Sequence, residues 1–228
     1  MPNHIILKNK IKNFNKKITV SGDKSISIRW VLFSSIASGV SSASNLLMSE
    51  DVLTAISAIK KLGIKVSLNK NICKIYGKGI NGYNYKKNLS INSGNSGTLG
   101  RLILGLIINT PHSIKLIGDK SLSNRDFKRV SDPLSNFGAS FKLIKNKYLP
   151  LKIIGSSKLK PIKYLENRGS AQCKSAVMFA GMRTNGKTFI KAKKSRNHTE
   201  LLCKYLKLPI KIKKQKNYDL IEVNKVRK

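Results

Sequence analysis

Acidic residues are scarce in this 228-residue chain, which has 10 Asp and Glu against 45 Lys and Arg and a formal net charge of +35. Cysteine is scarce as well. Cys73, Cys173 and Cys203 lie far apart without the CxxC or CxxH spacing of a zinc site, so we expect free thiols and no metal. No apolar run approaches the roughly 20 residues of a membrane helix, and the N-terminus lacks the continuous apolar segment of a secretory signal. These absences predict a soluble, cytoplasmic protein that does not enter a membrane.

The basic excess is mostly lysine, since 37 of the 45 basic residues are Lys and only 8 are Arg. Lysine has A/T-rich codons, as do the 27 Ile, so part of the excess reflects genome composition. The lysines are spread along the chain, which predicts weak, salt-sensitive contact with nucleic acid and no specific nucleic-acid role. In such a chain, Arg29, Arg101, Arg125 and Arg196 are candidates for the planar, bidentate contacts that only a guanidinium makes.

The sequence repeats its pattern at intervals of just over 70 residues, which indicates a three-fold repeated unit. Apolar helices are predicted from Ser25, Gly97 and Ser170, and amphipathic helices from Glu50, Asp126 and His198. Alternating runs predict one strand between the helices of each pair (42–47, 112–118, 187–192) and two after it (64–68 and 72–77, 139–144 and 149–155, 209–214 and 220–224). The predicted fold class is therefore α/β (α+β): one domain over residues 21–228, built from three β-α-β-α-β-β units with pseudo-threefold packing and the helices inside. Residues 1–20 fit none of the units.

The loops before the three apolar helices share one chemistry: SGDKS at 21–25, NSGNSGT at 92–98 and NRGSAQ at 167–172. Helix N-termini with small and hydroxyl residues present free amide groups, which attract phosphate and carboxylate. Each helix adds a cation one turn in, namely Arg29, Arg101 and Lys174, although Arg101 is equally well explained as a buried partner of a carbonyl or carboxylate. We expect a multi-point site for a small polyanion.

Five motifs in this order resemble the EPSP synthase (3-phosphoshikimate 1-carboxyvinyltransferase) family. They are GDKSISIR at 22–29, GNSGTLGRL at 94–102, GDKSLSNRDFKRVSDPL at 118–134, GSAQCKSA at 169–176 and SRNHTE at 195–200. The resemblance implies the inside-out barrel of enolpyruvyl transferases, whose domains also contain three β-α-β-α-β-β units. It implies transfer of the enolpyruvyl group of phosphoenolpyruvate to the 5-hydroxyl of shikimate 3-phosphate, a step of aromatic amino-acid biosynthesis, with no cofactor.

The resemblance also implies site residues, with Lys24 as the catalytic residue that touches both substrates. Shikimate 3-phosphate would be bound by Lys24, Ser25, Arg29, Ser170, Ala171, Gln172, Ser195 and Arg196. Phosphoenolpyruvate would be bound by Lys24, Asn95, Gly97, Arg125 and Gln172. His198 matches the family too, but a histidine at a helix start is more often a cap than a catalyst.

The chain departs from the family at Asn197, where Asp is usual, at Asp126, where Pro is common, and in its length. Family members are roughly twice as long, and their second domain supplies the acid and base carboxylates. We therefore expect the N-terminal part of the enzyme, with residues 1–20 as a strand segment of the second, C-terminal domain. That second domain would be absent from this chain or supplied by a complementary chain. We expect the chain to bind its substrates but to be inactive alone.

Two alternatives were weighed against this interpretation. The related UDP-N-acetylglucosamine enolpyruvyl transferases have Lys-Asn where this chain has Lys24-Ser25, and a reactive Cys that segment 109–125 lacks. The alternative from another class is a non-catalytic module of the same fold that binds an anion or RNA.

Overall fold

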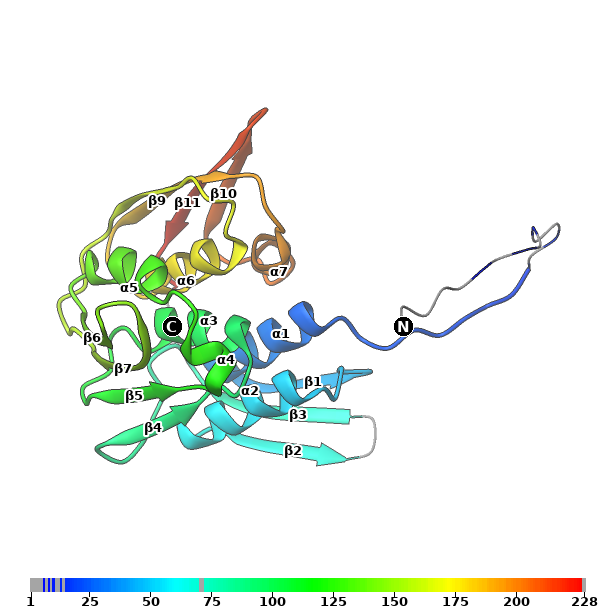
Figure 1. Ribbon diagram of the computed structural model, residues 1–228, viewed down its shortest axis with the longest axis horizontal. Helices are drawn as coiled ribbons and strands as arrows, with labels where there is room; N and C mark the ends of the chain where they lie inside the picture. Colours follow the sequence, from blue (N-terminus) through cyan, green and yellow to red (C-terminus); the bar gives the residue numbers. More distant parts are fainter. Residues whose placement is uncertain are drawn as a thin grey trace.

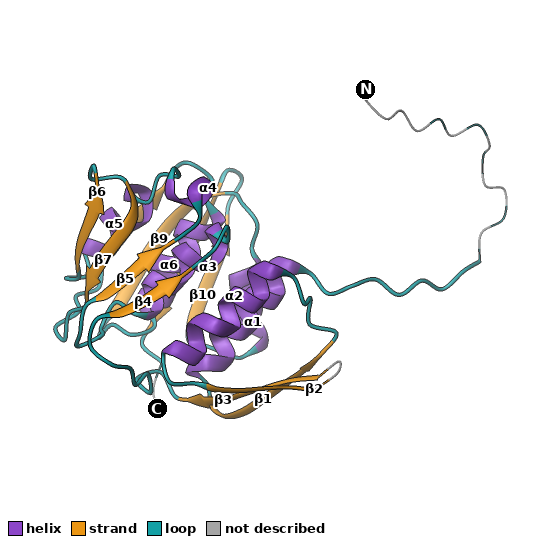
Figure 2. Cartoon of the chain, turned by 60° about the horizontal axis from the view of Figure 1, so that its bottom comes forward, coloured by secondary structure: helices purple, strands orange, loops and turns teal. Residues whose placement is uncertain are grey.

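Three sheets surround a group of packed helices in the computed structural model, which describes residues 6, 8, 10, 13, 15–69 and 72–226 (Figure 1). The first unit contains α1 (Lys24–Ile36), β1 (Ser38–Ser44), α2 (Glu50–Lys61), β2 (Lys65–Asn69) and β3 (Ile72–Lys78). Its strands form an antiparallel sheet in the order β1-β3-β2, and α1 and α2 cover one face of this sheet (Figure 2).

The second and third units share one topology. The second contains β4 (Leu89–Asn92), α3 (Gly97–Leu106), β5 (Ile114–Ile117), α4 (Lys120–Ser123), α5 (Lys128–Ser135), β6 (Ser140–Ile144) and β7 (Tyr148–Ile154), with the sheet order β4-β5-β7-β6. The third contains β8 (Lys163–Glu166), α6 (Ala171–Gly181), β9 (Lys187–Lys193), α7 (His198–Tyr205), β10 (Ile210–Lys214) and β11 (Tyr218–Asn224), with the order β8-β9-β11-β10. In both, the leading strand pairs in parallel with the strand after the apolar helix, and the other pairs are antiparallel. The repeat predicted from the sequence is confirmed in these two units.

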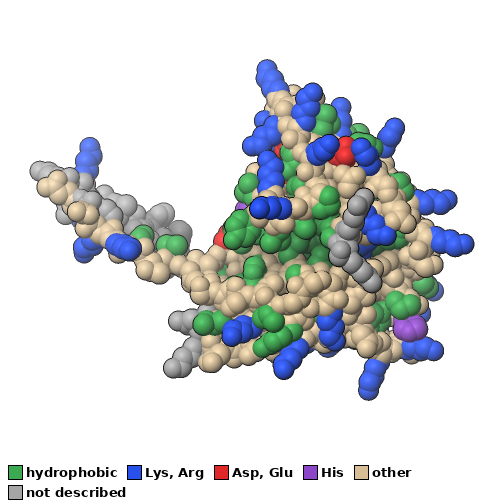
Figure 3. Space-filling view, turned by 180° about the vertical axis from the view of Figure 1, so that it is seen from behind, with side chains coloured by type: hydrophobic (Ala, Val, Ile, Leu, Met, Phe, Trp, Pro, Cys, Tyr) green, Lys and Arg blue, Asp and Glu red, His purple; other side chains and the backbone are tan. Residues whose placement is uncertain are grey.

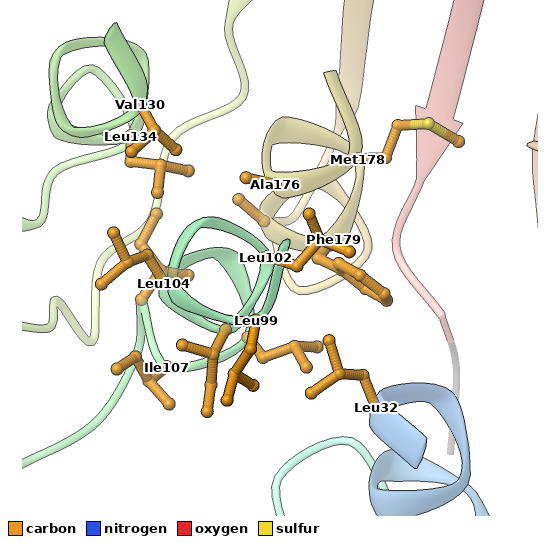
Figure 4. Packing of buried hydrophobic residues seen from close by; sticks show 14 of the residues in the cluster. Leu32, Leu99, Leu102, Leu104, Ile107, Val130, Leu134, Ala176, Met178 and Phe179 are labelled. Carbon is orange, nitrogen blue, oxygen red and sulfur yellow. The ribbon is translucent and has the colours of Figure 1, made fainter. Parts of the chain in front are cut away.

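Helices α1, α3 and α6 form the interior, as expected from their apolar sequences. Figure 4 shows Leu99 and Leu102 of α3 between Leu32 of α1 and Phe179 of α6, all of them fully buried. Helices α3 and α6 approach so closely that a Cβ built on Gly105 would lie 2.1 Å from the carbonyl oxygen of Ala176. Glycine is therefore required at this crossing. Burial of each large apolar side chain contributes about 1.5–3 kcal/mol, so the helical interior is the main source of stability.

Several predicted boundaries were wrong, each for a local reason. Helix α1 begins at Lys24 and not at Ser25, because the Asp23 carboxylate accepts a hydrogen bond from the Ile26 amide at 2.7 Å and caps the helix. Helix α6 begins one residue after Ser170, which is its N-cap. Helix α5 begins at Lys128 and not at Asp126, since the Asp126 side chain accepts from the Arg129 amide at 3.3 Å from outside the helix.

The first unit differs most from the sequence prediction. Its strand β1 covers residues 38–44 and not 42–47, because Asn45 takes a left-handed conformation (φ 55°) that ends the strand. Within the described residues, no leading strand corresponds to β4 or β8. Residues 15–20, which precede this unit, are exposed, form no helix or strand, and extend away from the body (Figure 1).

Candidate anion-binding site

The three apolar helices begin with side-chain caps, each of which accepts a hydrogen bond from one amide of the first turn. Asp23 caps α1, Ser96 caps α3 by accepting from the Leu99 amide at 3.3 Å, and Ser170 caps α6 by accepting from the Cys173 amide at 3.2 Å. Each serine oxygen accepts one bond within its helix, and the hydroxyl keeps its proton and a second lone pair for a ligand. Because a helix N-terminus carries a partial positive charge, the three starts favour an anion.

Arg101 and Gln172 join the first turns of α3 and α6. The Arg101 guanidinium donates to the Gln172 side-chain oxygen at 2.7 Å, and the Gln172 amide donates to the Thr98 hydroxyl at 3.0 Å. Arg101 is buried and also donates to the carbonyls of Gly97 and Asp126, at 3.3 and 3.4 Å. Arg101 is thus a buried link that orients Gln172, which agrees with the second of its two interpretations.

Arg125 adds an exposed guanidinium beside α3. It donates to the Asn95 side-chain oxygen at 2.9 Å, and the Asn95 amide in turn donates to Asp119 at 2.7 Å. A Cβ built on Gly97 would lie 2.9 Å from Nη1 of Arg101 and 3.2 Å from Nη1 of Arg125. The two guanidiniums therefore flank the backbone at residue 97, where a side chain has little room.

Arg29 lies in the second turn of α1 and reaches across to α6 and α7. Its Nε donates to the Thr199 hydroxyl at 2.7 Å, its Nη1 to the Ser25 carbonyl at 2.9 Å and its Nη2 to the Ser175 hydroxyl at 3.4 Å. These bonds use three of the five N–H groups of a guanidinium, which leaves one on each terminal nitrogen. The structure thus holds Arg29 in a fixed orientation before any ligand is present.

The charge of Arg29 acts on its surroundings. Burial lowers the pKa of Arg29 to about 10, and the carboxylate of Glu200 opposes this shift, so the side chain stays cationic at neutral pH. Burial and the nearby Arg29 lower the pKa of His198, at the start of α7. His198 is therefore a neutral imidazole near pH 7, beside a fixed positive charge.

Lys174 does not join the anion site, contrary to the sequence-based expectation. Its ammonium group lies 2.6 Å from a carboxylate oxygen of Glu200, and the two side chains are 0% and 4% exposed. The spacing between Ser170 and Lys174 correctly predicted the face of α6 on which Lys174 lies. That face is covered by α7 and is not open to a ligand. Lys174 consequently contributes to packing between two helices and not to a surface for a ligand.

The remaining expected site residues lie at the same helix starts. The Lys24 side chain is 54% exposed and pairs with Asp51 of α2 at 2.8 Å. Ser25 and Ala171 are partly exposed on the first turns of α1 and α6. In the loop before α7, Arg196 is exposed, whereas the Ser195 hydroxyl is buried without a hydrogen-bond partner among the described residues. Ser195 is therefore a donor without a protein acceptor.

Two hydroxyl residues in this network were missed from the sequence: Ser175 and Thr199. Each lies inside one of the quoted motifs. Their position inside these motifs was the signal in the sequence that could have identified them. Spacing along one helix could not reveal that Ser175 and Thr199 meet across two helices at 2.6 Å.

Several features away from this site bear on other classes of function. Cys73, Cys173 and Cys203 are free and buried, as expected. Within the described part of the chain, no three His, Cys, Asp or Glu side chains are grouped as metal ligands would be, and no helix has the length and hydrophobicity needed to cross a bilayer. Figure 3 shows Lys and Arg side chains distributed around the visible face and not gathered into one patch.

The chain was compared with known proteins and structures. A family model described as EPSP synthase (3-phosphoshikimate 1-carboxyvinyltransferase) matches residues 8–228. The 3-phosphoshikimate 1-carboxyvinyltransferase of Streptococcus agalactiae serotype Ia is 44% identical over 185 residues, 80% of this chain and 43% of the relative. That of Bacillus cytotoxicus is 41% identical over 195 residues, 85% of this chain and 46% of the relative.

Solved structures give the same result. An EPSP synthase from Acinetobacter baumannii matches with a TM-score of 0.84 at 31% identity, and covers 92% of this chain and 47% of its own. The chain spans a little under half the length of the curated relatives it matches. Its five motifs, its repeated units and these matches agree, and the chain belongs to the EPSP synthase family.

Proposed function

We propose that this chain binds shikimate 3-phosphate and phosphoenolpyruvate as the substrate-binding part of an enolpyruvyl transferase. In that reaction the 5-hydroxyl of shikimate 3-phosphate attacks C2 of phosphoenolpyruvate as C3 is protonated, and phosphate then leaves. The proposal is carried by the grouping of three capped helix starts with three guanidiniums, those of Arg29, Arg101 and Arg125. Both substrates are polyanions, which free amides and guanidiniums bind strongly.

Shikimate 3-phosphate is assigned to the side of α1, α6 and α7. Arg29 and Arg196 supply positive charge there, and the Ser195 hydroxyl is a donor with no acceptor among the residues that the structure describes. The full proposed set is Lys24, Ser25, Arg29, Ser170, Ala171, Gln172, Ser195 and Arg196. Ser170 contributes its proton to an anion while its oxygen caps α6.

Phosphoenolpyruvate is assigned to the side of α3. Arg125 and Asn95 line this side, and the backbone at Gly97 leaves room for a close approach. Gln172 lies between the two proposed substrate positions, where its bonds to Arg101 and Thr98 hold it. Lys24, a flexible point charge, reaches both ligands once it leaves Asp51.

The acid and base are proposed to come from a second domain, carried by further sequence or by another chain. Six described carboxylates around the starts of α1, α3 and α6 already have a partner: Asp23 the Ile26 amide, Asp51 Lys24, Asp119 Asn95, Asp126 the Arg129 amide, Glu166 the Arg168 and Ser170 amides, and Glu200 Lys174. Residues 1–20 are proposed to form a strand of that second domain, which is supported by residues 15–20, since these are exposed and lie in no helix or strand. The 228-residue chain alone would bind its substrates without turnover.

The free cysteines of the chain support a cytoplasmic location, which stays a prediction.

Calorimetry tests the proposed binding. Shikimate 3-phosphate should bind more tightly than shikimate by about 2 kcal/mol, because its phosphate adds charge-assisted bonds to those that the carboxylate of both ligands can form. Arg196→Ala should remove most of this difference, whereas Lys204→Ala, which removes an exposed cation at the other end of α7, should not. Equal affinities for the two ligands would contradict the proposal, and turnover by the chain alone would contradict the need for a second domain.

RNA binding tests the alternative function. The dispersed lysines predict affinity that falls steeply between about 50 and 200 mM salt and shows no sequence preference. Sequence-selective RNA binding at the higher salt, unchanged by Arg196→Ala, would favour the non-catalytic module instead.

A further inference from the structure

The buried ion pair of Lys174 and Glu200 has no role in the function proposed above. It joins the second turn of α6 to the first turn of α7 at 2.6 Å. Apart from this contact, neither charged group has a hydrogen-bond partner among the described residues. Removing two charges from water is costly, and apolar residues in place of such a pair often give equal or greater stability. Stability alone therefore does not account for this pair.

The neighbours of the pair make the second contact between the same two helices. Ser175 follows Lys174 on α6 and Thr199 precedes Glu200 on α7, and the two hydroxyls are 2.6 Å apart. A hydroxyl has one proton, and that of Ser175 goes to the Ala171 carbonyl at 2.7 Å. Thr199 must then donate to Ser175. The hydrogen bonds therefore all run in one direction: the Nε of Arg29 donates to Thr199, Thr199 to Ser175, and Ser175 to the Ala171 carbonyl.

Arg29 forms no ion pair of its own among the described residues. Lys174 holds the Glu200 carboxylate at 2.6 Å, and from that position the carboxylate still favours the charged form of Arg29. The exposed Arg196 lies in the loop just before α7, so the position of α7 also sets the position of Arg196. A displacement of α7 from α6 would therefore disturb both arginines at once.

We propose that Lys174 and Glu200 are positioning residues: their buried ion pair fixes α7 against α6, and thereby aims Arg29 at the phosphate-bearing substrate. This inference rests on the proposed function for its ligand, but the orientation of Arg29 is a property of the ligand-free chain. It can therefore be tested with and without shikimate 3-phosphate.

The test uses Lys174→Met, Glu200→Gln and the double variant Lys174→Met/Glu200→Leu in the 228-residue chain. The control is Glu222→Gln, which removes a carboxylate from the more exposed Lys187–Glu222 pair, whose charged atoms are 3.3 Å apart. Three quantities are measured: the melting temperature, the dissociation constant for shikimate 3-phosphate, and the NMR signal of the Arg29 Nε–H, assigned by its loss in Thr199→Val.

Both single variants should broaden the Arg29 Nε–H signal and weaken shikimate 3-phosphate binding at least tenfold. The double variant should regain the melting temperature of the wild type without regaining the signal or the affinity, since apolar packing does not fix the register of two helices. Glu222→Gln should change neither the signal nor the affinity.

Two results would overturn the inference. One is a double variant that recovers the signal and the affinity together with its stability, because the pair would then be a replaceable packing contact. The other is a sharp Arg29 signal in a folded single variant. If the wild type does not bind shikimate 3-phosphate, the proposed function fails, and the NMR comparison by itself still decides whether the pair orients Arg29.

Discussion

Arg101 donates to the side-chain oxygen of Gln172 at 2.7 Å, and this bond joins the N-terminal turns of α3 and α6. The same guanidinium also donates to two backbone carbonyls and lies over the ring of Phe127, 5.0 Å from its centroid. One planar group therefore fixes the two helix starts and a loop relative to one another. A single ammonium has no such fork, which gives the first prediction.

Arg101→Lys should destabilise the chain by about 1–3 kcal/mol, because buried acceptors lose their donor. The free energy of unfolding in urea measures the effect. The control is Arg125→Lys at an exposed position, where a change within about 0.5 kcal/mol is expected. Equal stability of the two variants would show that the Arg101 fork is dispensable.

Gly105→Ala should destabilise the chain more than Gly100→Ala on the same helix. At Gly105 the added Cβ would meet the Ala176 carbonyl at 2.1 Å, so α3 and α6 must separate. At Gly100 the added Cβ would lie 3.2 Å from the Phe127 ring. This contact is only slightly too close, and a small movement of the ring relieves it. We expect a cost of about 1–3 kcal/mol or more for overpacking at Gly105. Denaturant midpoints of the two variants provide the measurement, and the reverse order would contradict the close crossing.

The repeated architecture could be predicted because its signals are local. An apolar helix such as α6 and an alternating strand such as β9 (KTFIKAK) show their periods within a few turns or residues. The four-residue strands β4 and β8 were not located individually, since four residues are too few to display alternation. These two strands form because they pair with other strands, and the partner strands lie elsewhere in the sequence.

Which residues bind the ligands stays a prediction, whereas the connections between them are visible only in the structure. Motifs indicated Arg29, Gln172 and Arg125; the first two lie in α1 and α6, and Arg125 lies in the loop after α4, beside the start of α3. Lys174 was misassigned because helical spacing gives the face of a residue and not the element that covers it. The partner of Lys174 is Glu200, 26 positions along the chain, and only the packing of α7 brings the two together.

The lowered pKa of His198 should make the chain lose stability in mild acid. Burial and Arg29 disfavour the charged imidazole in the folded state, with a smaller effect of Arg196 and opposing effects of Asp23 and Glu200. The unfolded chain, with a histidine pKa of about 6.5, then binds more protons than the folded chain. The contribution of His198 to the free energy of unfolding is therefore fully present above about pH 6.5, and it is lost as the pH falls through the lowered pKa of the folded chain.

Thermal unfolding of the wild type and of His198→Gln between about pH 7.5 and 5 measures this loss. The wild type should lose more stability than the variant over this interval, because both share all other titrating groups. Parallel curves would show that His198 has the same pKa in the folded and unfolded chains.

Gly97→Ala should separate ligand binding from folding. The added Cβ would lie 2.9 Å from the Arg101 guanidinium and 3.2 Å from that of Arg125, and both are ends of long side chains that can move. Arg101 is buried and held by three hydrogen bonds, so the chain should still fold but lose some stability, less than Arg101→Lys does, while the exposed Arg125 is displaced from the proposed phosphoenolpyruvate site. Loss of one charge-assisted contact should weaken phosphoenolpyruvate binding by about 1.5–3 kcal/mol. The affinity is measured by titrating phosphoenolpyruvate into the chain saturated with shikimate 3-phosphate. Gly100→Ala, one turn along the same helix and away from both guanidiniums, should bind it as the wild type does. If Gly97→Ala retains full affinity as well, neither the space at residue 97 nor the Arg125 guanidinium beside it serves phosphoenolpyruvate.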